Sequence, residues 1–75
     1  MQGYVVVFEG DDESGYSSYS PDLPGVVAAA GTRGETEQLM VDAMTAHVAL
    51  MRELGLDVPE PAANVDAKIL SVPAA

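Results

Sequence analysis

A turn bracketed by two prolines constrains this chain more than any other stretch. Residues 20–25 read Ser-Pro-Asp-Leu-Pro-Gly. Pro21 and Pro24 have no N–H group and cannot donate to a sheet ladder, and each drives the residue before it towards extended geometry. Gly25 adopts a positive φ without steric cost. We therefore predict a rigid turn between two strands, made by Pro21, Asp22, Leu23, Pro24 and Gly25.

Three strands are predicted around this turn. Residues 3–9 are rich in β-branched and aromatic side chains, and both faces of that stretch are apolar. Residues 16–20 enter the turn and residues 26–30 leave it. Residues 10–15 are polar and bounded by glycines, which is typical of a hairpin loop longer than two residues.

One long helix is predicted after the third strand. Thr32 and Glu35 have the spacing of a capping box, in which Thr32 is the N-cap and Glu35 the third helical residue. The helical pattern continues to about Leu54, and Gly55 is in the position expected for a C-terminal glycine cap.

Apolar residues cover more than half of the helix circumference. One stripe at helical spacing is predicted to face the sheet, and it comprises Thr36, Leu39, Met40, Ala43, His47, Leu50 and Leu54. A second stripe beside it comprises Val41, Met44, Val48 and Met51. One face of a small sheet cannot cover both, so the second stripe is predicted to contact a partner or another copy of the chain. His47 is interpreted as a histidine packed at the core edge.

The C-terminal part is predicted to add a short strand. Two prolines in residues 56–61 give an extended exit from the helix, and residues 62–66 form a linker. Residues 67–72 have the pattern of an edge strand, which either completes this sheet or pairs with another chain. Ile69 and Leu70 are therefore further candidates for an oligomer interface. The predicted fold is α+β, in the order β-β-β-α-β, as one domain over residues 1–75 with its core in about 3–61.

Composition favours a protein partner over a nucleic acid. Twelve acidic and three basic residues give a formal net charge of −9, and the three bases are scattered, so no basic face for direct nucleic-acid binding is expected. An acidic chain suits a basic protein partner. The candidate contacts are Glu9, Asp11, Asp12, Glu13 and Asp22.

Self-association is the expected source of additional stability. A chain of 75 residues buries only about 60–65% of its unfolded surface, which makes its own core marginal. With no cysteine and one histidine, disulfides and Cys- or His-rich metal sites are excluded. A dimer or tetramer is therefore expected, with no cofactor.

Neither catalysis nor membrane insertion is expected. The three consecutive acids of residues 11–13 lack the alternate spacing of a calcium loop, and the serines of residues 17–20 have no general base nearby in sequence. The first apolar run, residues 4–8, is too short for a signal peptide, and no run approaches the ~20 residues of a membrane span. A cytoplasmic protein is the expectation.

The order of these motifs resembles the HicB antitoxin family. The resemblance rests on the turn of residues 21–25, the Gly31-Thr32 helix start, Gly55-Leu56 and the Pro59-Glu60-Pro61 exit, and it spans roughly residues 4–61. It implies a partial RNase H-like fold without nuclease chemistry. It also implies a partner, a small basic mRNA-cleaving toxin of the HicA type. Many members carry a further DNA-binding domain, whereas only fourteen residues follow Pro61 here, so the chain resembles a short stand-alone form.

These features leave three functional hypotheses. The first is an antitoxin that masks a basic ribonuclease by protein–protein contact. The second is a structural homo-oligomer without a toxin, which the second helix stripe favours. The third is a small hydrolase or nuclease using Asp22, His47 and the acids of residues 11–13, and nothing in the sequence brings those groups together.

Overall fold

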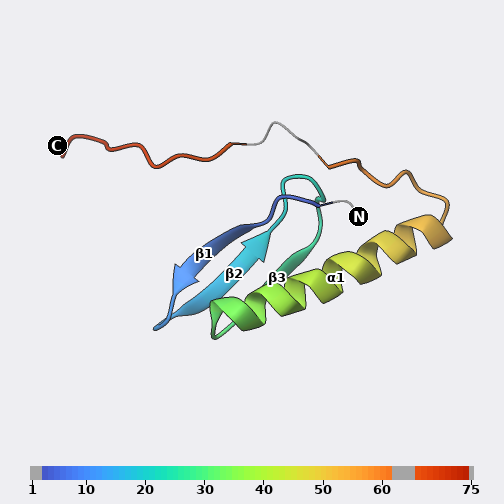
Figure 1. The fold of residues 1–75 in the computed structure, drawn as a ribbon, viewed down its shortest axis with the longest axis horizontal. Helices are drawn as coiled ribbons and strands as arrows, with labels where there is room; N and C mark the ends of the chain where they lie inside the picture. Colours follow the sequence, from blue (N-terminus) through green and yellow to red (C-terminus); the bar gives the residue numbers. More distant parts are fainter. Residues whose placement is uncertain (1–2, 62–65, 75) are drawn as a thin grey trace.

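Three antiparallel strands in chain order form one sheet, and a single helix covers one of its faces (Figure 1). This computed structural model describes residues 3–61 and 66–74. The strands are β1 (Val7–Asp11), β2 (Gly15–Tyr19) and β3 (Val27–Ala30), and the helix is α1 (Arg33–Glu53). The predicted α+β class and the three-strand-and-helix core are confirmed.

The strand register separates the two faces of the sheet. Glu9 pairs with Ser17, and Ser17 pairs with Ala29, so these three side chains form one row on the exposed face. In the neighbouring row Ser18 is buried and Ala28 is partly buried on the opposite face, which packs against α1. The small side chains of that row let the helix approach the sheet closely.

The first strand begins later than predicted, at Val7 rather than at residue 3. Upstream of it, the Val5 N–H donates to Asp22 Oδ2 at 2.7 Å, and the Ser20 hydroxyl donates to the Val5 carbonyl at 2.7 Å. Two side chains of the turn thus replace a ladder partner for Val5, because the chain turns at Ser20 and Pro21 has no N–H group. At its other end β1 continues through Gly10 to Asp11, so the hairpin loop is only residues 12–14.

The proline-bracketed turn supplies most of the core. The buried apolar side chains of the described residues are Leu23, Val26 and Met40, and two of the three come from the turn and its exit. The Ser20 Oγ also accepts from the N–H groups of Asp22 and Leu23, each at 3.2 Å. Residues 21–25 therefore fold inward at Leu23, in the stretch where the sequence predicts the turn.

Both caps of α1 are as predicted. The Thr32 side chain accepts from the Glu35 N–H at 3.1 Å, and Gly55 follows the C-cap with a φ of +73°. The Arg33 guanidinium lies 4.1 Å from the centre of the Phe8 ring, which links the first turn of α1 to β1 by a cation–π contact.

The helix is rotated about its axis relative to the prediction. Leu39, Leu50 and Leu54 were expected to face the sheet and are exposed instead, at 46%, 51% and 63%. Thr36, Met40 and Ala43 do face it, together with Met44, Val48 and Met51 of the second stripe. The prediction was wrong because the apolar residues cover more than half of the circumference, so periodicity alone does not select one side.

The predicted strand over residues 67–72 is not formed within this chain. Residues 66–74 carry no strand, and their extended backbone runs apart from the sheet (Figure 1). Ile69 is 94% exposed. A strand is defined by pairing, and no edge of the described sheet lies beside this segment. The linker predicted at residues 62–66 falls almost wholly outside the described residues.

Candidate functional site: an acidic hairpin and an apolar groove

The tip of the β1–β2 hairpin carries three consecutive acidic side chains, Asp11, Asp12 and Glu13, which we call the acidic hairpin. Asp11 shapes the turn, since its Oδ1 accepts from the Ser14 N–H at 2.8 Å, the Ser14 hydroxyl at 2.7 Å and the Glu13 N–H at 3.0 Å. The hydrogen bonds from Ser14, followed by that from Glu13, hold the pKa of Asp11 below its usual value of 3.8. Asp11 therefore keeps its negative charge at the tip.

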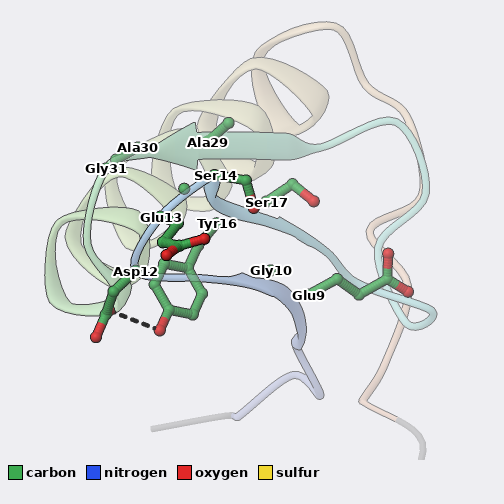
Figure 2. A pocket seen from close by; sticks show the side chains of 11 residues that line it. Glu9, Gly10, Asp12, Glu13, Ser14, Tyr16, Ser17, Ala29, Ala30 and Gly31 are labelled. Atoms are coloured by element: carbon green, nitrogen blue, oxygen red, sulfur yellow. Dashed lines mark hydrogen bonds between the residues drawn. The ribbon is translucent and has the colours of Figure 1, made fainter.

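The second acid of the hairpin anchors a tyrosine. The Tyr16 hydroxyl donates to Asp12 Oδ1 at 2.9 Å, and this bond to the ionised carboxylate raises the pKa of Tyr16 above its usual value of 10.0 (Figure 2). Glu13 has its side chain exposed at the tip.

The acids around the hairpin do not converge. In Figure 2 Glu9 points away from Asp12 and Glu13, which lie on the other side of the open hollow of about 680 Å³ beside the hairpin. Within residues 3–61 and 66–74, no group of three or more acidic or histidine side chains is placed to hold a metal ion. The arrangement is a spread negative surface, which is suited to a partner with several separated positive charges.

The sheet face away from α1 continues this surface. Its exposed side chains, which we call the outer sheet face, are Glu9, Ser17, Tyr19, Val27 and Ala29. Val27 is 72% exposed, so this face combines a charge at one end with uncovered apolar area at the other.

A second surface is an apolar groove between the N-terminal segment and α1. It has a volume of about 880 Å³, and its lining is mainly apolar: Tyr4, Val6, Val41, Met44, Thr45, Val48, Ala49 and Arg52. The Tyr4 hydroxyl donates to the Pro59 carbonyl at 2.8 Å, which ties the exit of the helix to the start of this groove.

The family of the chain is decided by a comparison with family models. The model described as "HicB_like antitoxin of bacterial toxin-antitoxin system" matches residues 4–71. The chain belongs to this antitoxin family. No curated protein and no solved structure matches it. The antitoxin's family implies a role in a toxin–antitoxin system, with a toxin as the kind of partner.

Four of the antitoxin's five predicted contact residues lie at or beside the hairpin, and the fifth lies elsewhere. Asp22 is buried in the turn, where it accepts the Val5 N–H. The structure therefore gives Asp22 a place inside the fold, apart from Glu9 and the acidic hairpin. His47 is half-buried on α1 close to Gly25, which agrees with the interpretation of His47 as a histidine packed at the edge of the core.

The sequence predicts an interface on the α1 side of the antitoxin's groove but not on the side formed by the N-terminal segment. The sequence predicts Val41, Met44 and Val48 on α1 as interface residues, but it does not predict Tyr4 and Val6 of the opposite wall or Arg52 on α1 itself. The sequence does contain a signal for the second wall, because residues 4–8 are apolar on both faces and this indicates a segment covered from two sides.

Within the part of the chain that is described, no helix is long and apolar enough to cross a membrane.

Proposed function

We propose that this HicB-like antitoxin binds a small, basic, mRNA-cleaving toxin of the HicA type and blocks it by direct protein contact. The observation that carries the proposal is the family match over residues 4–71. The net charge of −9 supports it, because complementary charge accelerates and orients association with a basic protein. The antitoxin would act without enzymatic chemistry of its own, in the cytoplasm, where bacterial mRNA is cleaved.

The acidic hairpin and the outer sheet face are the proposed contact surface. Glu9, Asp12 and Glu13 place negative charge at one end of the sheet, and Tyr19 and Val27 offer apolar area at the other end of the same face. Protein interfaces usually combine apolar area with charged and polar side chains beside it. Since exposed charges are screened over about 8–10 Å at physiological salt, binding through this surface should weaken as salt rises.

Binding and charge reversal test the proposal. The small basic protein encoded beside the antitoxin gene is purified, and its affinity for the antitoxin is measured by calorimetry, with inhibition of its RNA cleavage as the functional readout. The triple variant Glu9→Lys, Asp12→Lys, Glu13→Lys should weaken binding at least tenfold and restore cleavage.

A charge-matched control separates the surface from the overall charge. The variant Asp42→Lys, Glu53→Lys, Asp57→Lys changes the net charge equally, on α1 and its exit, and should weaken binding much less. Equal weakening by both variants would reject the hairpin as the contact surface. Failure of the unaltered antitoxin to bind any neighbouring basic protein would reject the antitoxin function itself.

A second candidate function is homo-oligomerisation, and the uncovered apolar surface favours it. The groove includes Val41, Met44 and Val48, and Met51 lies on the same side of α1 against the core. Ile69 and Leu70 are exposed, so the described chain leaves apolar side chains in water that a second copy would cover. Self-association and toxin binding use different surfaces in this proposal and are compatible. Light scattering of the isolated protein tests it, and a monomer at micromolar concentration would contradict it.

A further inference from the structure

We propose that residues 67–72 of one copy, which we call the arm, pair as a strand with the open edge of β1 in a second copy and cover its apolar groove. The inference specifies how the self-association proposed above takes place, and it does not depend on the toxin. Its elements are an unpaired edge, an unpaired apolar segment and a groove between them.

The edge of β1 has backbone groups available for pairing. The sheet order is β1-β2-β3, so one side of β1 has no neighbouring strand among the described residues. Both backbone groups of Val5 are directed at the Ser20–Asp22 turn. In an extended chain consecutive residues direct their groups to opposite sides, so those of Tyr4 and Val6 are directed to the open edge. An added strand would hydrogen-bond there.

The arm has the length and composition of the missing strand. Six residues at about 3.3 Å each span about 20 Å, comparable to the edge from Tyr4 to Gly10. Ile69, Leu70 and Val72 are all largely exposed, with Ile69 almost fully so. The antitoxin family match runs to residue 71, so it covers the arm except for its last residue.

The groove provides the surface that the arm's side chains would cover. Its apolar walls come from both sides, Tyr4 and Val6 beside β1, and Val41, Met44 and Val48 on α1. A strand placed at the edge of β1 directs alternate side chains towards the face that α1 covers, and therefore towards this groove. Leu70 and Val72 lie two residues apart in the arm and would share that side.

A second copy is the occupant that the geometry favours. The helix exit is fixed near the start of β1 by the bond between Tyr4 and Pro59, yet the arm runs apart from its own sheet (Figure 1). With three buried apolar side chains among the described residues, a single copy gains little stability alone. Two copies exchanging arms fill both grooves by one two-fold operation, which is a closed and self-complementary arrangement.

Disulfide trapping tests the pairing directly, because the chain contains no cysteine and every introduced thiol is unique. Val6→Cys is combined in separate double variants with Ile69→Cys, Leu70→Cys or Ser71→Cys, so that neighbouring registers are sampled. Under mild oxidation we expect a covalent dimer in at least one register. Mixing Val6→Cys protein with the matching arm variant should give the cross-linked heterodimer. A fast-migrating monomer with an internal disulfide would overturn the proposal, since it would show pairing within one chain.

Light scattering without toxin provides the second measurement. The species in solution should have twice the 7.8 kDa monomer mass. The double variant Ile69→Ser, Leu70→Ser should raise the protein concentration at which half of the dimer dissociates at least tenfold. Leu50→Ser, an exposed site on α1 outside the groove, is the matched control and should leave it unchanged. A dimer that persists after the arm is altered, or that is lost in Leu50→Ser, would overturn the proposal. Toxin affinity is measured in a separate experiment, so an absence of toxin binding would not change the result of the cross-linking or light-scattering measurements.

Discussion

Removing the Ser20 hydroxyl tests whether the turn holds the N-terminal segment in place. Ser20 is buried, and its Oγ donates to the Val5 carbonyl while accepting from the N–H groups of Asp22 and Leu23. The substitution Ser20→Ala removes all three bonds without adding volume. The Leu23 N–H retains its bond to the Ser20 carbonyl at 3.3 Å, whereas the Val5 carbonyl and the Asp22 N–H lose their bonds to the Ser20 hydroxyl.

The expected loss of unfolding free energy is about 2–3 kcal/mol. Each hydrogen bond contributes about 0.5–1.5 kcal/mol net, and a buried group left unpaired costs about 1–3 kcal/mol. A chain of 75 residues at about 0.05–0.15 kcal/mol per residue has a total of roughly 4–11 kcal/mol. The substitution should therefore remove a large fraction of the stability.

Urea unfolding followed by circular dichroism measures this effect at a fixed protein concentration. With a slope of about 1 kcal/mol per M, the midpoint should fall by about 2–3 M. Ser17→Ala, on the exposed sheet face, is the control and should change the free energy by less than about 0.5 kcal/mol. If Ser20→Ala changes it as little as the control does, the turn does not hold the N-terminal segment through this hydroxyl.

Three further predictions concern the helix start, the hairpin and its charge. Thr32→Ala removes the cap of α1 and should lower the unfolding free energy by about 1 kcal/mol in urea. Gly10→Ala should strongly destabilise or prevent folding, measured by thermal unfolding, because the residue has a φ of +128° and an added Cβ would overlap the Gly15 carbonyl oxygen. Asp11 should titrate below 3.8 by NMR, since three hydrogen bonds favour its ionised form; its contribution to stability is complete above a pH of about 3.9 and is lost as the pH falls through the lower folded value.

The two substitutions among these predictions each have a matched control. Thr45→Ala, in the middle of α1, should not destabilise, because its hydroxyl bonds only the preceding turn of the helix. Gly34→Ala should stabilise α1 by about 0.5–1 kcal/mol, as its added Cβ meets no atom within 4 Å. The capping argument would be contradicted if Thr32→Ala changed the unfolding free energy no more than Thr45→Ala does. The argument on Gly10 would be contradicted if Gly10→Ala folded normally, and the argument on Asp11 if its titration midpoint were at or above 3.8.

The sequence by itself determined the elements and the helix ends. Proline geometry fixed the turn at residues 20–25, and the Thr32–Glu35 spacing and Gly55 fixed the caps of α1. These signals are local, because each depends on the backbone of a few neighbouring residues. The same holds for the acidic hairpin, whose position between two glycines placed its charges at an exposed tip.

Only the tertiary structure decided which side of α1 packs, how the N-terminal segment is held and where the arm lies. Met44, Val48 and Met51 face inward because α1 packs over β2 and β3 with Met40 and Thr36 buried beneath it, a choice that helical spacing leaves open. Asp22, which its charge marked as a contact residue, instead holds the Val5 backbone 17 positions away in sequence. The arm has the composition of a strand, yet a strand forms only where an edge is present to pair with it, and that depends on the arrangement of whole elements in space rather than on the sequence of the arm.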